Sequence, residues 1–251
     1  MYVFNQIKKY KKIKCVFFSR RNGFSNGIYK SLNCGIGSKD KKKNVVKNRN
    51  LALKKIGLQR KKLIIPNQTH SNRVVFVNEK TTNNKIYADA LITDSNKIVI
   101  GILTADCAPV CFFDYKKNIV SIVHVGWKGA KNNIIKNTIK LMLECGSKTN
   151  NIISCIGPCI GKYSYEVKDD FFKKFIAENK QNKKFFLKKS NKMFFDLKSY
   201  IIKKINILGI KKVFLKKFDT FKDEKNFFSY RRSVEMKQKD YGRCLSVISL
   251  N

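Results

Sequence analysis

Short apolar runs recur along the chain, and Gly, Pro, Asn or Asp residues separate them. Several runs lack polar alternation, which is typical of strands that are covered on both faces. Turn residues at their ends favour strands over longer buried helices. The pattern predicts strands at Cys15–Ser19, Leu63–Ile65, Arg73–Val77, Ala90–Thr93, Ile98–Leu103, Val110–Phe113, Ile119–Val125, Asn151–Ile156, Lys212–Leu215 and Leu245–Leu250.

Other segments carry apolar residues at helical spacing. Gly57 suits the left-handed position that closes a helix, and Asp196 suits the position that opens one. The segment that begins at Ala130 places Ile134, Ile135, Thr138, Leu141 and Met142 on one stripe. The predicted helices run from Ser38 or Asp40 to Gly57, from Ala130 to Cys145, and from Asp196 to Gly209.

The order of these elements predicts the fold class. Strands outnumber helices and do not alternate with them regularly, so we expect a mixed α/β (α+β) sandwich rather than a βαβ repeat. No internal repeat or Pro/Ser-rich linker divides the 251 residues. We therefore expect a single domain over residues 1–251.

Composition adds an unusual charge, with 54 basic against 17 acidic residues and a formal net charge of +37. Clustered cations attract nucleic acids and anionic membranes. Here the charge is mostly lysine, is spread along the chain, and accompanies abundant Asn and Ile, as in AT-rich genomes. We interpret it as a solvated basic surface and expect no specific nucleic-acid or membrane partner, with polyanion binding as the alternative.

The eight cysteines form no regular framework, and a chain of this size does not need disulfides to fold. The first residues contain no apolar run long enough for a signal peptide, and no stretch is long enough to span a membrane. These features predict a cytoplasmic protein with reduced thiols.

The candidate chemistry is concentrated in two histidines and one cysteine. His70 and His124 stand at predicted strand ends, and Cys107 follows an apolar strand. Two imidazoles and a thiolate suit Zn²⁺ and leave its fourth position open, as catalytic sites do. Asp106 is a candidate for orienting a ligand or for acid–base work. Taken singly, each histidine could be a hydrogen-bonded structural residue and the cysteine a small core residue.

Motifs along almost the whole chain resemble the YfiH-like family, first labelled multicopper polyphenol oxidase (laccase-domain) proteins and later described as purine nucleoside phosphorylases. The resemblance runs in order from about residue 15 to the end. The segments that carry it are Ser19–Asn33, Asn48-Arg49, Gln68-Thr69-His70, Ala88-Asp89-Ala90-Leu91, Thr104-Ala105-Asp106-Cys107, His124-Val125-Gly126-Trp127, Ile156–Ile160, Phe227–Arg232 and Gly242-Arg243.

The resemblance implies a four-layer αββα-type sandwich with a catalytic zinc held by His70, Cys107 and His124. It also implies phosphorolysis of adenosine, inosine and methylthioadenosine, with some adenosine deamination. Purine nucleosides and inorganic phosphate are then the expected partners, and the protein is expected to be a monomer or homodimer. The motif positions offer as substrate-binding candidates Arg20, Asn33, and Arg231 or Arg232.

Three positions depart from the family's pattern. The family commonly has Gly where this chain has Asn22 and Ser71, and Arg where it has Lys128. A lysine supplies charge without the bidentate fork of a guanidinium. These departures affect the expected substrate preference and rate, but the zinc ligands are intact.

Other functions remain open at this stage. Cys107 and His124 also suit a Cys–His hydrolase, with peptidoglycan precursors as a possible substrate linked to the family. Copper-dependent polyphenol oxidation is less favoured, because two histidines cannot furnish a cluster of several coppers. A basic nucleic-acid-binding module is the non-enzymatic alternative.

Overall fold

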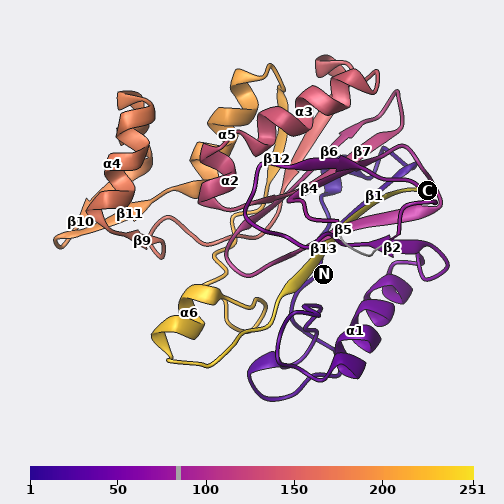
Figure 1. The fold of residues 1–251 in the computed structure, drawn as a ribbon, viewed down its shortest axis with the longest axis horizontal. Coiled ribbons are helices and arrows are strands. Elements are labelled where there is room, and N and C mark those ends of the chain that lie inside the picture. The colour runs from indigo at the N-terminus through magenta and orange to yellow at the C-terminus, as the bar shows by residue number, and fades with distance from the viewer. Residues whose placement is uncertain (83–85) are drawn as a thin grey trace.

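The computed structural model describes residues 1–82 and 86–251. The described chain forms stacked layers of helix, sheet, sheet and helix, seen edge-on in Figure 1. This is the four-layer αββα-type sandwich that the family resemblance implies, and it has the mixed α/β class that the order of elements predicts.

The large sheet forms one inner layer, in the order β12-β8-β6-β7-β4-β3. Its centre is antiparallel, whereas the pairs β12–β8 and β3–β4 are parallel. Its strands are β3 (Val74–Phe76), β4 (Ala90–Thr93), β6 (Ala108–Asp114), β7 (Ile119–Val125), β8 (Ile152–Ile156) and β12 (Lys212–Leu215). β4, β6, β7 and β8 are buried throughout, which explains their apolar runs.

The small sheet forms the other inner layer, in the order β1-β13-β5-β2. β13, which ends at Leu250, lies between β1 and β5 and pairs antiparallel with both. It thereby joins two strands that are far apart in sequence. Its strands are β1 (Ile13–Phe17), β2 (Lys62–Ile64), β5 (Ile98–Thr104) and β13 (Cys244–Leu250).

Apolar side chains fill the space between each pair of layers. Ile100, Phe113 and Ile122 belong to the core between the two sheets. Leu53 belongs to the core under helix α1 (Lys42–Lys55), on the outer face of the small sheet. The outer face of the large sheet is covered by α2 (Trp127–Lys131), α3 (Ile134–Glu144) and α5 (Leu197–Ile207).

Two of the helix predictions hold closely and one changes. Gly57 adopts a left-handed φ of +70° after α1, and the Asp196 carboxylate accepts a hydrogen bond from the Ser199 N–H at the start of α5. The single helix expected over 130–145 is two helices, because Asn133 takes a left-handed φ of 66° between α2 and α3. Asparagine tolerates that conformation better than most residues.

A lobe that the sequence pattern did not predict projects beside the helical layer (Figure 1). We call residues 166–195 the α4 lobe. Its core is aromatic, with Phe175 stacked on Phe171 and fully buried. The lobe contains β9 (Glu166–Val167), α4 (Asp169–Glu178), a 3₁₀ helix (Lys180–Phe185), β10 (Phe186–Lys189) and β11 (Lys192–Phe195). Nearer residue 251 a short helix, α6 (Tyr230–Glu235), precedes β13.

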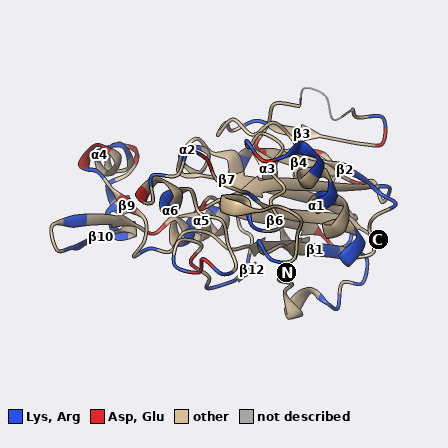
Figure 2. Ribbon diagram, turned by 90° about the horizontal axis from the view of Figure 1, so that it is seen from below, with Lys and Arg blue, Asp and Glu red and all other residues tan. Residues whose placement is uncertain are grey.

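Basic residues are scattered over helices and loops on many sides of the molecule (Figure 2). They therefore do not form one compact stripe in this view. Among the described helices, none has the length and apolar character that a membrane span requires. All eight cysteines are free.

Candidate metal centre and its cavity

The structure brings His70, Cys107 and His124 together. Their potential ligand atoms all lie within 4.8 Å of one another. His70 lies in the loop between β2 and β3, Cys107 between β5 and β6, and His124 near the end of β7. The two imidazole rings are nearly perpendicular, with centroids 4.8 Å apart. Three residues that are far apart in sequence thus lie together where several strands end.

Two residues at the metal-ligand cluster have strained backbone conformations. His70 has φ = 57° and Asp106 has φ = 86°, a region that L-residues rarely occupy. Such conformations cost on the order of 1–3 kcal/mol each and persist where surrounding contacts enforce them. The strain turns the chain sharply on both sides of the cluster, which places the His70 and Cys107 side chains close together.

The contacts that enforce the geometry converge on Asp89, which is fully buried. Its Oδ1 lies 2.8 Å from His124 Nδ1 and accepts a hydrogen bond from the His70 backbone N–H at 3.1 Å. Its Oδ2 accepts hydrogen bonds from the Ser71 N–H at 2.6 Å and the Ser71 hydroxyl at 2.7 Å. One carboxylate therefore orients the ring of one histidine and the backbone of the other, as outer-shell residues of metal sites do.

Charge and burial set the protonation of this group without a metal. Burial alone lowers the pKa of His124, but the neighbouring Cys107 sulfur and the Asp89 carboxylate outweigh it and raise the pKa to about 9. Burial opposes ionisation of Asp89, yet hydrogen bonds from His124 and Ser71 lower its pKa to about 2. Burial and the nearby His124 lower the pKa of His70. A metal bound through both histidines must therefore displace a proton from His124.

The donor set fits a tetrahedral metal ion. Zinc binds imidazole nitrogen at about 2.0–2.1 Å and thiolate sulfur at about 2.3 Å, so its ligand atoms lie within about 4 Å of each other. Because Nδ1 of His124 faces Asp89, its Nε2 is the atom presented to the cluster. Gly126 leaves room for this arrangement, since a Cβ there would lie 2.9 Å from His70 Nδ1 and 3.0 Å from Cys107 Sγ. These three residues can hold a metal ion.

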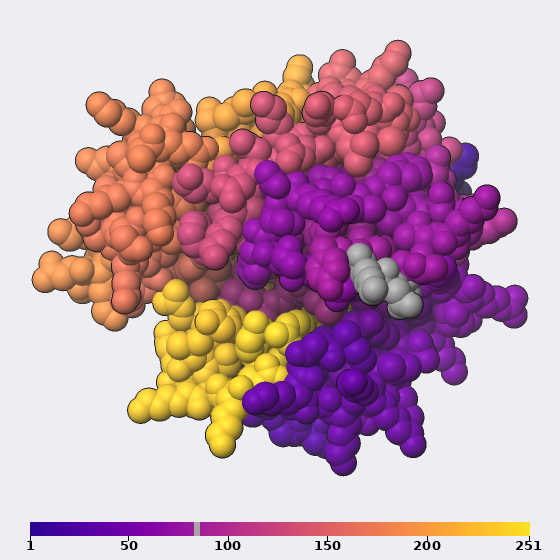
Figure 3. Space-filling view, in the orientation of Figure 1, coloured from indigo at the N-terminus to yellow at the C-terminus, as the bar shows by residue number. Residues whose placement is uncertain are grey.

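The cluster opens into a cavity of about 1110 Å³. In the space-filling view the surface is hollowed between the yellow segment around α6 and the magenta segments above it (Figure 3). The cavity is lined by the cations Arg49, Lys128, Lys168, Arg231 and Arg243, and by the aromatic residues Trp127, Tyr165, Phe171, Tyr230 and Tyr241. A wall with both cationic and aromatic side chains suits a ligand that has both a flat ring and negative charge.

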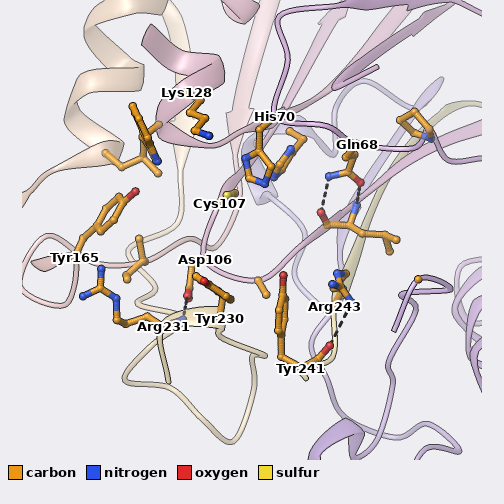
Figure 4. Close-up of a pocket in the computed structure, with 18 of the residues that line it drawn as sticks. Gln68, His70, Asp106, Cys107, Lys128, Tyr165, Tyr230, Arg231, Tyr241 and Arg243 are labelled. Carbon is orange, nitrogen blue, oxygen red and sulfur yellow. Dashed lines mark hydrogen bonds between the residues drawn. The ribbon is translucent and has the colours of Figure 1, made fainter. Parts of the chain in front are cut away.

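The two arginines that the sequence could not separate have different surroundings. Arg231 lines the cavity, donates to the Glu166 carbonyl at 2.7 Å and lies near the Tyr165 ring (Figure 4). Arg232 is outside the cavity lining and donates hydrogen bonds to the carbonyl groups of Thr220, Phe221 and Phe227. Only the first of the pair is placed to meet a ligand in this cavity.

The structure does not bring Arg20 or Asn33 into the cavity lining. The Arg20 guanidinium donates to the Lys30 carbonyl at 2.6 Å and stacks on the Phe228 ring, so it organises the loop near residue 30. Asn33 is fully buried, and its side-chain oxygen accepts a hydrogen bond from the Arg243 N–H at 2.9 Å. In this geometry both candidates act on neighbouring chain segments.

Asp106 is next to Cys107 and is almost fully buried. Burial raises its pKa, and hydrogen bonds from Arg231, Thr220 and Ser229 oppose that rise. The Thr220 hydroxyl donates to Oδ1 at 2.7 Å, while the Ser229 hydroxyl and Arg231 N–H donate to Oδ2 at 2.9 and 2.7 Å. With both oxygens occupied, Asp106 joins the Cys107 turn to the start of α6.

The positions that depart from the resembled family have simple local accommodations. Asn22 sits at φ = 62°, a conformation that asparagine tolerates. Ser71 adds its hydroxyl to the hydrogen bonds on Asp89, which a glycine cannot do. Lys128 lines the cavity beside Trp127. None of the three disrupts the cluster of potential ligands.

Sequence reasoning missed several residues at this site. Asp89 had a detectable signal, a carboxylate inside the apolar segment Ala88–Ile92. Arg49 and Arg243 had another, because arginine occurs only eight times among 54 basic residues. In so lysine-rich a chain, an arginine inside one of the resembled motif segments is a candidate for a position that needs a guanidinium. Gln68 pairs through both side-chain ends with the Leu103 backbone, which only the fold reveals.

Fold and site together define an αββα protein with a potential His₂Cys metal group at the floor of a cationic, aromatic cavity. Residues 14–251 match the family described as multi-copper polyphenol oxidoreductase laccase, and the chain belongs to this family.

The chain also resembles proteins with functional names. It is 36% identical over 188 residues to a purine nucleoside phosphorylase of Rickettsia prowazekii, covering 74% of this chain and 77% of that one. It is 32% identical over 241 residues to a purine nucleoside phosphorylase of Haemophilus influenzae, covering 95% and 94%. The crystal structure of the hypothetical protein YfiH of Bacillus licheniformis superposes with a TM-score of 0.90 at 27% identity, covering 98% and 95%. These relatives support an enzyme of this kind.

Proposed function

We propose that the protein is a zinc-dependent purine nucleoside phosphorylase. It splits adenosine, inosine and methylthioadenosine into the free base and ribose 1-phosphate or its methylthio derivative, with adenosine deamination as a side activity. The observation that carries this proposal is the His70–Cys107–His124 group at the floor of a cavity lined by arginines and aromatic rings. The names of the relatives support the same reaction.

Each part of the cavity has a role in this proposal. His70, Cys107 and His124 hold the metal, and Asp89 fixes the orientation of His124. A zinc ion there would supply positive charge to an oxygen atom and could activate a water molecule, the chemistry that deamination needs. Arg231, beside the Tyr165 ring, contacts the nucleoside.

The aromatic wall suits the purine. Tyr165 and Phe171 have ring centroids 6.1 Å apart, and Trp127 lies 4.9 Å from Phe171. Such rings favour stacking with a flat heterocycle. Asp106 supports the site by holding the turn of Cys107, with its carboxylate already hydrogen-bonded.

A second candidate function rests on one specific observation. The side chains of Asp89, His124 and Cys107 form a spatial chain of hydrogen-bonding groups. Nδ1 of the histidine faces the carboxylate, and its other nitrogen faces the sulfur. This is also the arrangement of a Cys–His hydrolase with an orienting carboxylate. The two functions differ in whether the sulfur binds metal or attacks the substrate.

The deciding experiment combines metal analysis with chromatography of reaction products. We expect about one zinc per chain, and release of adenine and hypoxanthine only when inorganic phosphate is present. Cys107→Ala should remove both the metal and the activity, whereas the exposed Arg60→Ala should leave both unchanged. Activity without metal that thiol alkylation abolishes would instead establish the hydrolase. Base release that is equal with and without phosphate would refute phosphorolysis.

The remaining parts of the proposal concern the whole protein. We propose that residues 1–251 form one catalytic unit, that it works in the cytoplasm as a monomer or homodimer, and that the basic surface serves no specific nucleic acid. Duplex DNA should then bind weakly and without sequence preference at physiological salt, at about 10⁻⁴–10⁻⁶ M or weaker. Fluorescence anisotropy with two unrelated duplexes tests this, and discrimination between them would contradict it.

A further inference from the structure

Two arginines on the small-sheet side of the cavity have no role so far. Arg49 projects from α1, and its Nε donates to the Cys34 carbonyl at 2.8 Å. Burial lowers the pKa of this guanidinium. Arg49 forms no ion pair with a carboxylate of the described residues. A partly buried cation without a carboxylate partner is costly unless something else neutralises it.

Arg243 also lines the cavity and comes from the chain just before β13. Its backbone is fixed from two sides, because its N–H donates to Asn33 Oδ1 and its carbonyl accepts from the Cys34 N–H at 3.1 Å. Its guanidinium lies 4.3 Å from the centroid of the Tyr241 ring. Gly35 allows the stem to pass, since a Cβ there would lie 3.0 Å from Arg243 Cδ. This arginine is thus preorganised.

Both arginines are anchored on Cys34, and both line the cavity. We call Arg49, Arg243 and the loop Cys34–Gly37 the arginine corner. In Figure 4, Arg243 lies on the opposite side of Cys107 from Arg231 and Tyr165. The arginine corner is therefore separate from the part of the aromatic wall that contains Tyr165.

The carboxylates around the cavity do not fully neutralise the arginine corner. Asp106 is held at the start of α6 by three hydrogen bonds, and Glu166 pairs with Lys192 at 3.0 Å. Asp170 lies on α4 and pairs with Lys174 at 3.7 Å. Asp240 interacts with Arg243; burial opposes its ionisation, but hydrogen bonds from the Lys39 N–H and the Tyr29 hydroxyl, together with Arg243, lower its pKa. One carboxylate therefore faces two guanidinium groups, and the corner keeps an excess of positive charge.

We propose that the arginine corner is the binding site for the inorganic phosphate that attacks the nucleoside. This deepens the proposed function and rests on it. A phosphate oxygen forms a bond to ribose C1′ as the C1′–N9 bond breaks, and the proton of the hydrogen phosphate passes to the departing purine. Two guanidinium forks from different elements suit a tetrahedral dianion. Phosphate then enters from the small-sheet side, the purine lies against the aromatic wall, and the metal group stands between them. Asn33 is a positioning residue, because it holds the backbone of Arg243.

The experiment measures phosphate binding directly, without relying on turnover. Inorganic phosphate is titrated into the zinc-loaded protein by calorimetry at constant ionic strength, with chloride as the reference anion. Arg49→Met and Arg243→Met keep the length of the stem and remove the charge. Arg231→Met on the opposite wall and the exposed Arg60→Met are the matched controls. Circular dichroism and metal content verify that each variant is folded and loaded.

We expect saturable phosphate binding that weakens at least about 10-fold in Arg49→Met and in Arg243→Met, the scale of a lost charge-assisted contact. The Arg60→Met variant should bind like the parent, and Arg231→Met should change by less than about 3-fold. In the phosphorolysis assay, the two corner variants should raise KM for phosphate more than KM for inosine.

Two results would overturn the assignment: no saturable phosphate binding by the parent, or a loss caused by Arg231→Met and not by the corner variants. Failure of the proposed function looks different. In that case phosphate would bind at the corner as expected, but no base would be released from any purine nucleoside.

Discussion

The metal-ligand side of the cavity and the α4 lobe contribute to the same space but are held by different interactions. Around His70 and His124 the positions are set by hydrogen bonds to one buried carboxylate, Asp89. The lobe is held by apolar ring contacts, such as Phe171 on Phe175 at 4.9 Å, and by exposed ion pairs.

These interactions differ in how sharply they define position. A buried carboxylate with several hydrogen bonds has a defined orientation, and its loss leaves polar groups unpaired. Aromatic packing favours proximity but tolerates several arrangements. The comparison suggests that the metal side controls chemistry, whereas the lobe controls stability and the shape of the aromatic wall.

The largest expected effect comes from a substitution in the lobe, at its contact with α5. Phe175→Ala removes a fully buried ring that contacts Phe171, Phe195 and Tyr200. We expect the free energy of unfolding to fall by about 3–5 kcal/mol. Urea denaturation measures the loss, and metal analysis at low temperature should still find one zinc per folded chain. Loss of zinc from the folded variant would show that the two regions are not independent.

The next effect strikes the metal side alone. Gly126→Ala places a Cβ against His70 and Cys107, although the φ of −81° at this position suits alanine. We expect zinc affinity to fall by more than the roughly 10–100-fold that loss of an outer-shell partner causes. Competition with a zinc chelator measures it. Gly37→Ala, where a Cβ meets open space, is the control and should bind zinc normally.

A smaller effect is expected when Asp89 is changed without loss of volume. Asp89→Asn keeps the size but removes the charge that orients His124, so we expect about 10–100-fold weaker zinc binding. The Ser71→Gly variant, which removes only one donor to Asp89, should weaken binding much less. The same chelator competition ranks the two. An unchanged affinity in Asp89→Asn would remove Asp89 from its proposed role.

The smallest effect concerns pH and the metal-free protein. Because the Cys107 sulfur and Asp89 outweigh burial and raise the pKa of His124 to about 9, its protonated form stabilises the fold. That stabilisation is complete below the usual histidine pKa of about 6.5 and disappears as pH rises toward 9. We therefore expect the free energy of unfolding of chelator-treated protein to decline over this range. In the His124→Gln variant this free energy should depend less on pH. An equal slope in the variant and the parent would show that His124 is not the titrating group.

The central strands were predictable because burial on both faces requires apolar residues throughout, as in β6 and β7. The α4 lobe was not predicted. Its helix has an amphipathic pattern, with Phe171, Phe172, Phe175 and Ile176 at helical spacing, that the sequence analysis did not use, and its strands β9 to β11 are short and partly exposed. The break between α2 and α3 depends on one left-handed residue, Asn133, inside a pattern that continues across it. Periodicity cannot detect such a break.

The site divides in the same way. His70, Cys107 and His124 were found because few residue types bind zinc and the chain has two histidines. The neighbouring Arg231 and Arg232 were not separable, because the direction of each guanidinium depends on the turn of α6. Asn33 was expected at the ligand, but the fold places it behind Arg243. Sequence identifies chemistry more readily than it identifies distance.

The pairing of β13 has a consequence for how the molecule is made. β13 lies between β1 and β5, and it is synthesised roughly 230 residues after β1. During translation these two strands wait with open hydrogen-bonding edges, which are prone to aggregation and proteolysis. A nascent chain that stalls before Cys244 therefore cannot complete the small sheet, nor can it contribute Arg243 from a fixed backbone. Degradation of stalled chains and chaperone capture should both depend on whether this single strand has emerged from the ribosome.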